Sequence, residues 1–376
     1  MRNSTFLYIL VPCFIIAIVF FTTIWQHKSV FQKKTDYQSL KHLYENSQYA
    51  PDPSNRREII QDWDLYSYAG ITYLTEGRLD EVNYEHPPLG KYLFGLFYLV
   101  CQNTVILQII LGLLLLVLIF QIGQRILGNT WITLLPPLLL SQEKLFIEQV
   151  THSLLDLLQV TAICLFMLVA TLKKQSGKHV VTLGVLLGIV AATKFPTVAL
   201  LLGASYGVTL ILKRNKHALK QFATVTTVGI LFYLGTYLPL ALTKGPDSII
   251  TTHIKALRFH LSHVPEYPPL APTKVMFLNQ WPVWFDIANP IHSVAEWNIL
   301  WPALGISIVV LPLVYLLRRK IGRESIVSIF TFIYFLFINT RLFFPRYLVL
   351  ILPFLYVLLL WEITLIVQRV KKTPHP

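Results

Sequence analysis

The sequence predicts an all-α polytopic membrane protein with about ten transmembrane helices and a large first external loop. Hydrophobic residues make up 54% of the 376 residues and charged residues 14%, well below the share that is usual in soluble domains. Apolar runs long enough for membrane helices recur from one end of the chain to the other. Basic residues gather in alternate short connecting segments, as expected if these segments face the cytoplasm.

The predicted spans are apolar segments bounded by polar residues. The first, Phe6–Thr22, has no small-residue cleavage site after it, so we interpret it as a retained signal anchor. The other nine lie near 105–122, 130–142, 154–172, 180–193, 197–212, 221–241, 299–317, 325–338 and 347–368. The segments 130–142 and 180–193 are shorter than the roughly 20 residues of a full crossing, so a re-entrant path stays open for both.

The charge pattern predicts the topology. The net charge of +13 arises mostly from the short cytoplasmic segments, which excludes a nucleic-acid-binding surface as its cause. Residues 1–376 form a single integral membrane domain in this interpretation. Its termini are cytoplasmic, and two long loops, 26–104 and 242–298, lie outside the plasma membrane if the source is prokaryotic. Long loops are usually functional, so the active site is expected on the outer face.

The first external loop contains two acidic residues at the start of a predicted helix, Asp62 and Asp64. One interpretation is that either residue caps the helix N-terminus. The other is a catalytic role, because a low-dielectric boundary raises the pKa of a carboxyl group towards the range of a general base. The two interpretations are compatible.

A His-Pro-Pro-Leu-Gly-Lys stretch follows at residues 86–91. The prolines suit the first turn of a helix. Lys91 is expected to extend towards the interface, a behaviour typical of lysines at membrane surfaces. His86 and Lys91 are also candidates for a binding site beside the two carboxylates.

Three further charged residues stand within or beside apolar segments: Asp156, Lys194 and Arg346. Ionisable groups at such positions are functional candidates, because they are costly to bury in lipid. A guanidinium suits phosphate oxygens. Helix–helix hydrogen bonding for Asp156, and interfacial anchoring for Arg346 and the nearby Arg341, stay open as alternatives.

The second external loop is rich in histidine and tryptophan. His253, His260 and His263 make a zinc site conceivable, but no cysteine or second ligand pair supports it. The tryptophans are most simply an interfacial belt. Cys13, Cys101 and Cys164 lack metal-ligand spacing and are expected to be buried free thiols.

The loop motif resembles that of the protein O-mannosyltransferase family, which depends on a dolichyl- or polyprenyl-phosphate sugar and is one of the C-type glycosyltransferase families. In that family an acid opens a helix and His-Pro-Pro-Leu-Gly-Lys follows about two dozen residues later, as Asp62 and residues 86–91 do here. The second acid of the family is replaced by Trp63, and Asp64 is the substitute. Weaker matches follow in order at Leu155-Asp156, Thr193-Lys194-Phe195, His253 to His260, Trp281-Pro282 and Asn298 to Trp301.

The resemblance implies a C-type glycosyltransferase fold and transfer of a mannose-like sugar from a polyprenyl-phosphate donor to an acceptor hydroxyl, with inversion. It implies catalytic roles for Asp62 and Asp64, and substrate binding by His86, Lys91, Asp156, Lys194 and Arg346. The expected partners are the donor lipid, a protein or glycan acceptor and membrane lipid, with no nucleic acid. No cofactor is certain, no metal ligand is assigned, and a divalent cation stays open. Two alternatives remain: a lipid or polysaccharide acceptor, and a transporter or flippase of a lipid-linked substrate.

Overall fold

The computed structural model describes residues 2–50, 52, 54, 56–128, 131–172, 176–214, 216–262, 268–283, 285–318 and 322–370, and this part of the chain is mostly helical. The first half contains α1 (Arg2–Trp25), α2 (Lys28–Gln32), α3 (Tyr37–Glu45), α4 (Asp62–Thr75), α5 (Leu89–Cys101), α6 (Ile106–Leu127), the 3-10 helix η2 (Trp131–Leu134), α7 (Leu135–Ser141), α8 (Lys144–Thr151) and α9 (Leu155–Ala170). The second half contains α10 (Gly177–Thr193), α11 (Pro196–Leu212), α12 (Ala218–Gly235), α13 (Leu238–Lys244), α14 (Asp247–Ser262), α15 (Ala271–Leu278), α16 (Trp301–Arg318), α17 (Ser325–Ile338), the 3-10 helix η3 (Pro345–Leu350) and α18 (Leu352–Val370). The two-residue strands β1 (Trp281–Pro282) and β2 (Ile291–His292) pair antiparallel.

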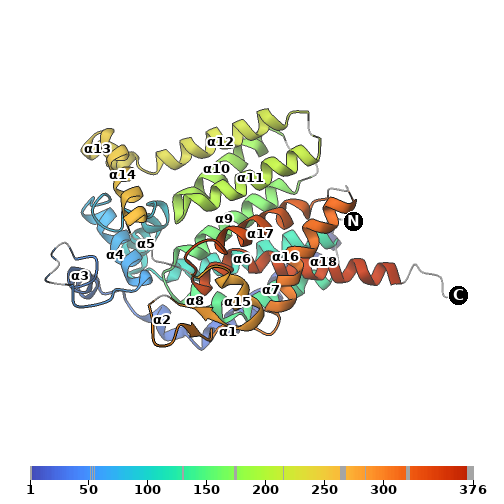
Figure 1. Ribbon diagram of the computed structural model, residues 1–376, viewed down its shortest axis with the longest axis horizontal. Helices are drawn as coiled ribbons and strands as arrows, with labels where there is room; N and C mark the ends of the chain where they lie inside the picture. The colour runs from blue at the N-terminus through green and yellow to red at the C-terminus, as the bar shows by residue number, and fades with distance from the viewer. Residues whose placement is uncertain are drawn as a thin grey trace.

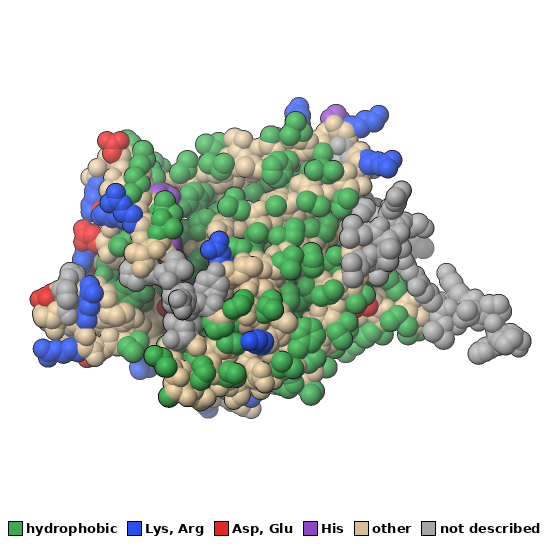
Figure 2. All heavy atoms as spheres, viewed as in Figure 1, with side chains coloured by type: hydrophobic (Ala, Val, Ile, Leu, Met, Phe, Trp, Pro, Cys, Tyr) green, Lys and Arg blue, Asp and Glu red, His purple; other side chains and the backbone are tan. Residues whose placement is uncertain are grey.

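The long helices form a bundle, and the elements of the two long loops gather at one of its ends. Figure 1 shows α6, α9 to α12 and α16 to α18 running along the bundle, with α3, α4, α13 and α14 at the left end and the end of α18 at the right. Hydrophobic side chains cover the middle of the visible surface, and most charged side chains lie near its two ends (Figure 2). This distribution fits a bundle that crosses a membrane, so the chain is an integral membrane protein.

Each predicted span contains an apolar helix, which confirms the all-α membrane fold class. Among the described residues, α6 and α12 alone have the length and hydropathy of a complete span, and α8 with α9 adds a third if this pair, bent by 110°, is one broken span. Seven of the eight shorter apolar helices lie in the other predicted spans, and the eighth, α5, lies in the first loop. In the predicted span 130–142, η2 and α7 together are too short for a straight crossing.

A close crossing holds together α4 and α5, the two helices of the first loop that flank the turn of His86. A Cβ atom at Gly70 would lie 2.3 Å from the backbone oxygen of Lys91, and one at Gly95 would lie 2.1 Å from the backbone oxygen of Gly70. Only glycine allows the two backbones to come so close. The crossing therefore sets the position of Asp62, at the start of α4, relative to the turn that precedes α5.

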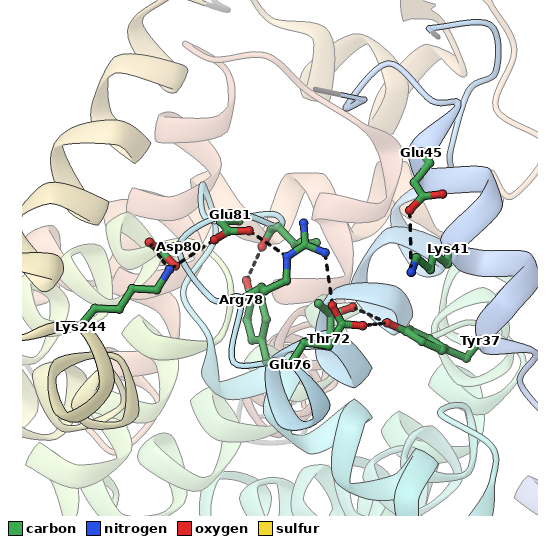
Figure 3. A network of polar contacts seen from close by, with 11 residues as sticks. Tyr37, Lys41, Glu45, Thr72, Glu76, Arg78, Asp80, Glu81 and Lys244 are labelled. Carbon is green, nitrogen blue, oxygen red and sulfur yellow. Dashed lines mark hydrogen bonds and ion pairs between the residues drawn. The ribbon is translucent and has the colours of Figure 1, made fainter. Parts of the chain in front are cut away.

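A polar network joins the first loop to the second (Figure 3). Arg78 pairs with Glu81 at 2.8 Å and with Glu76 at 3.3 Å, and the Tyr37 hydroxyl donates to Glu76. Lys244 at the end of α13 pairs with Asp80 at 2.7 Å. These pairs are partly exposed, so each is expected to contribute at most about 1 kcal/mol. Their structural effect is to keep the two loops at the same end of the bundle.

We predict that both long loops lie outside the cell. Single cysteines replacing Ser54 and Asn289, two exposed positions in these loops, should label with an impermeant thiol reagent on intact cells. A cysteine at the exposed Lys216, between α11 and α12, should label only after permeabilisation. The background needs Cys101→Ser, because this native cysteine is exposed and not buried as expected. Labelling at Lys216 with silence at Ser54 in intact cells would reverse the orientation.

Candidate functional site

Asp62 is the first residue of α4, and its carboxylate faces a cation from the far end of the chain. The N-cap is Gln61, which makes no side-chain cap bond, so the prediction that Asp62 or Asp64 caps the helix is wrong. Instead Arg346 Nη2 lies 2.5 Å from Asp62 Oδ2, and the Tyr66 hydroxyl donates to the same oxygen at 3.3 Å. Tyr66 reaches it because residues four apart share one helix face.

Arg346 approaches Asp62 from η3, which begins with Pro345 and leads into α18. Its guanidinium carbon lies 5.1 Å from the Phe344 ring centroid and 6.0 Å from that of Tyr347. Its Nε–H is buried and has no hydrogen-bond partner among the described residues. Arg346 therefore combines an ion pair with one donor that is available to a bound anion. The nearby Arg341 instead stacks on Phe337 at 5.6 Å, in keeping with an anchoring role.

Asp156 and Lys194 form a buried ion pair beside this first pair. Lys194 Nζ lies 2.8 and 3.0 Å from the two carboxylate oxygens of Asp156, and both side chains are almost completely buried. The packing of α9 against η3 brings Asp156 near the segment of Arg346. Lys194 is the C-cap of α10, and Pro196 begins α11. The Lys194 side chain therefore leaves the chain at the break between two apolar helices.

Aromatic rings join the two ion pairs into one cluster. Lys194 Nζ lies 5.2 Å from the Tyr347 ring centroid, 5.2 Å from that of Phe195 and 6.0 Å from that of Tyr66. Tyr347 thus lies near both cations, and Tyr66 lies near Lys194 while it donates to Asp62. The ring faces favour cations. We define this set, Asp62, Tyr66, Asp156, Lys194, Arg346 and Tyr347, as the paired-cation site.

We predict that the buried pair is also essential for stability. Lys194→Ala would leave Asp156 charged and uncompensated in the interior, which typically costs about 3–5 kcal/mol. The melting temperature of the variant in detergent should fall strongly. The double variant Asp156→Leu, Lys194→Met replaces the pair by apolar side chains and should recover most of the loss. If Lys194→Ala melted like the wild type, Asp156 would have to be neutral or solvated.

The turn before α5 places His86 against the paired-cation site. Its ring centroid lies 5.8 Å from that of Tyr66 and 5.0 Å from that of Phe195. Burial and the nearby Lys194 and Lys91 hold the pKa of His86 well below its ordinary value, so the ring is neutral at pH 7. Its Nδ1 is buried and has no partner among the described residues.

Lys91, in the first turn of α5, stabilises the turn of Asn83 to His86 through hydrogen bonds. Its ammonium donates to the backbone oxygen of Asn83 at 2.5 Å, to Asn83 Oδ1 at 3.1 Å and to the backbone oxygen of His86 at 2.7 Å. It is fully buried, so it does not extend to the interface as expected from the sequence. These three bonds use all the donors of an ammonium group.

Asp64 lies apart from Asp62, because residues two apart point to nearly opposite sides of a helix. It lines a separate cavity of about 520 Å³ between the first loop and α8. Lys33, Lys34 and His152 line the same cavity. Burial raises the pKa of Asp64, and the neighbouring His152 opposes that rise. We call this space the Asp64 cavity.

Several residues of the site were not predicted from the sequence. Tyr66 could have been found, since it follows Asp62 by one helical turn, but the only signal for Tyr347 is its position next to Arg346. Glu143 lies outside the paired-cation site. Its carboxylate accepts hydrogen bonds from Asn298 at 3.2 Å, from the indole of Trp301 at 3.3 Å and from the Tyr356 hydroxyl. It therefore connects the end of the second loop to α8 and α18.

The histidines of the second loop have separate partners. His253 Nε2 lies 2.8 Å from the Tyr233 hydroxyl, and His260 Nε2 lies 3.0 Å from the backbone oxygen of Glu85. His263 lies outside the described residues. Within the part of the chain that the structure describes, no group of three or more His, Cys, Asp or Glu side chains is arranged to hold a metal ion.

Comparisons with known proteins agree with this arrangement. Residues 85–239 match the profile of the family described as dolichyl-phosphate-mannose-protein mannosyltransferase. This range contains His86, Lys91, Asp156 and Lys194, so the resemblance predicted from the sequence is confirmed over this part of the chain. No curated protein sequence matches the chain at a significant level.

Solved structures match over most of the chain. ArnT from Cupriavidus metallidurans matches in its apo state with a TM-score of 0.58 and 14% identity, over 83% of this chain and 58% of ArnT. The structure of ArnT bound to undecaprenyl phosphate matches with a TM-score of 0.59 and 14% identity, over 99% of this chain and 64% of ArnT. The archaeal oligosaccharyltransferase AglB from Archaeoglobus fulgidus, in complex with an inhibitory peptide and a dolichol-phosphate, matches with a TM-score of 0.47 and 12% identity. The match covers 94% of this chain and 52% of AglB. The fold is therefore that of the C-type glycosyltransferases, and the chain spans less than two thirds of the length of ArnT.

Proposed function

We propose that this membrane protein transfers a sugar from a polyprenyl-phosphate donor to an acceptor hydroxyl at the paired-cation site. The observation that carries the proposal is the Asp62–Arg346 pair, in which a partly exposed carboxylate lies 2.5 Å from a guanidinium that has an unused donor. The family match and the undecaprenyl phosphate in the related ArnT structure support a lipid-phosphate donor. The mannosyltransferase description of the family favours a mannose-like sugar.

In this mechanism Asp62 is the general base. Its carboxylate takes the proton of the acceptor hydroxyl as the oxygen attacks the anomeric carbon. The new bond joins this carbon to the acceptor oxygen, while the bond from the same carbon to the phosphate oxygen breaks. A single displacement of this kind inverts the anomeric configuration.

Arg346 and Lys194 supply the positive charge that the leaving phosphate needs. The bond electrons leave with the phosphate, and fixed cations in a partly dry site stabilise this developing charge more than water would. Arg346 has its Nε–H available, and both cations lie near the Tyr347 ring, with Lys194 Nζ 5.2 Å and the Arg346 guanidinium carbon 6.0 Å from its centroid. Asp156 holds the ammonium of Lys194 in place.

The remaining candidates act around this centre. We assign Lys91 a positioning role in place of the expected contact with the substrate, since its donors are used by Asn83 and His86. His86, neutral and with an unused ring nitrogen, is suited to contact the sugar. Asp64 is suited to orient the acceptor in the Asp64 cavity, whose volume is within the range of small-ligand sites.

We further propose that residues 1–376 act as a single domain with the site on the outer face and both termini in the cytoplasm. The acceptor in this proposal is a hydroxyl on a protein. The same chemistry on a lipid or polysaccharide would use the same donor site, because the differences lie only in the acceptor.

The test must separate transfer from transport. The purified protein is placed in sealed vesicles that carry a synthetic polyprenyl-phosphate mannose, and the donor is followed by mass spectrometry. The proposal predicts that the donor is consumed when an acceptor extract is added, and polyprenyl phosphate appears. Movement of intact donor between the two leaflets without consumption would favour a flippase instead.

A further inference from the structure

The amphipathic helix α14 (Asp247–Ser262) has three distinct faces: one packs on the protein, one is apolar and exposed, and one is polar. Its inner face packs on the protein: Thr252 is buried, His253 contacts Tyr233, and His260 contacts the backbone of Glu85. These residues recur at the spacing of one helix face. The inner face therefore connects α14 to α12 and to the turn that carries His86.

The second face is apolar and exposed. Its members follow one another at helical spacing, four, three and four residues apart, and their exposed fractions are large for aliphatic side chains: Ile250 63%, Ile254 44%, Leu257 59% and Leu261 70%. Four exposed aliphatic side chains in one stripe would be costly to leave in water.

The third face is polar and positively charged. Thr251, Lys255, Arg258 and Ser262 are exposed and lie beside the apolar stripe on the helix surface. No acidic side chain of the described residues lies within 4.0 Å of the charged groups of Lys255 and Arg258. An apolar stripe bordered by cations is the pattern of a helix that lies in a membrane interface.

The orientation and surroundings of α14 agree with this pattern. It runs across the end of the bundle and not along it (Figure 1). It packs against α13, where Leu238 and Leu242 are 55% and 77% exposed, and α13 follows the exposed Leu231 and Leu234 of α12. The apolar surface of the span α12 thus continues along the chain into the stripe of α14.

We propose that α14 is embedded in the surface of the lipid bilayer at the loop end of the bundle. Its stripe of Ile250, Ile254, Leu257 and Leu261 enters the acyl region, and Lys255 and Arg258 contact lipid phosphates. Basic side chains near an anionic leaflet are attracted to it. The bilayer then holds α14 in place, and through the His260–Glu85 contact it supports the turn that positions His86.

The experiment compares two positions on this helix. In a background with Cys13→Ala, Cys101→Ser and Cys164→Ala, single cysteines replace Leu257 in the stripe or Lys255 on the polar face, and each carries an environment-sensitive fluorophore. The proteins are reconstituted in vesicles of equal parts phosphatidylcholine and phosphatidylglycerol, with and without brominated acyl chains. A label at Leu261 provides a second stripe position if the Leu257 variant does not elute as a folded protein.

The proposal predicts that brominated chains quench the stripe label strongly and that aqueous iodide quenches the Lys255 label more than the stripe label. Equal iodide quenching at both positions, with no effect of bromine, would overturn it. Protection of the stripe label from both quenchers would show a protein partner and not lipid. Protection that appears only after polyprenyl phosphate is added would show that the stripe holds the donor chain, which would also contradict the proposal.

Discussion

Asp62→Asn should reduce sugar transfer by at least about 100-fold, because a positioned general base typically contributes 10²–10⁴-fold to the rate. The amide has almost the same shape as the carboxylate but cannot accept the proton of the acceptor hydroxyl. The turnover number, measured with saturating donor and acceptor, should carry most of the loss. The variant should still elute as a folded protein in detergent, since Asp62 is partly exposed and does not cap α4.

The matched control is Asp64→Asn, two residues further along α4, whose side chain lines the separate Asp64 cavity. It makes the same chemical change in the same turn of α4. We expect Asp64→Asn to raise the acceptor concentration needed for half-maximal rate. The turnover number should stay within about tenfold of the wild-type value, because the substitution removes one contact with the acceptor. If Asp62→Asn kept activity within tenfold of the wild type and Asp64→Asn lost it, Asp64 would be the base.

Arg346→Ala should lower the turnover number by about 10²–10³-fold, the usual loss when one charge-stabilising donor is removed from an active site. The fold loss in turnover number should exceed the fold loss in donor affinity, because the contact between Arg346 and the phosphate strengthens as the phosphate leaves. Arg346→Lys should retain part of the activity, since the charge survives while the planar fork is lost. Kinetics over donor concentration at fixed acceptor give both quantities for each variant.

Arg341→Ala is the control for this experiment. Arg341 also precedes the last apolar helix but stacks on Phe337 and does not contact Asp62. It should leave the donor kinetics near those of the wild type. If Arg346→Ala changed only the dependence on acceptor concentration, Arg346 would belong to the acceptor path and not to the donor phosphate.

The fold class and the charged residues of the paired-cation site could be selected from the sequence, because both depend on local signals. Apolar runs of membrane length predict helices wherever they stand, and a charge beside such a run is rare enough to be noticed. Asp62, Asp156, Lys194 and Arg346 were selected in this way. Their pairing was not predictable, because Asp62 and Arg346 are 284 residues apart in the chain and meet only through packing of α4 near η3.

The roles of Lys91 and Asp64 show where local signals fail. Lys91 stands in a motif beside the site, but its direction depends on the turn of Asn83 to His86, whose backbone oxygens face it. Asp64 was grouped with Asp62 by proximity in the sequence, although the helical period separates them. The cap prediction failed because the helix begins at Asp62 itself, and a residue inside the first turn has no capping geometry.

The central claim is that the Asp62 and Arg346 side chains carry out sugar transfer from a lipid phosphate. The most direct measurement is product stoichiometry with purified protein, synthetic polyprenyl-phosphate mannose and an acceptor extract. We expect polyprenyl phosphate and mannosylated acceptor to form in equal amounts with the wild type, and both to form at least about 100-fold more slowly with Asp62→Asn. Equal product formation by both proteins, or recovery of intact donor from the wild type, would contradict it.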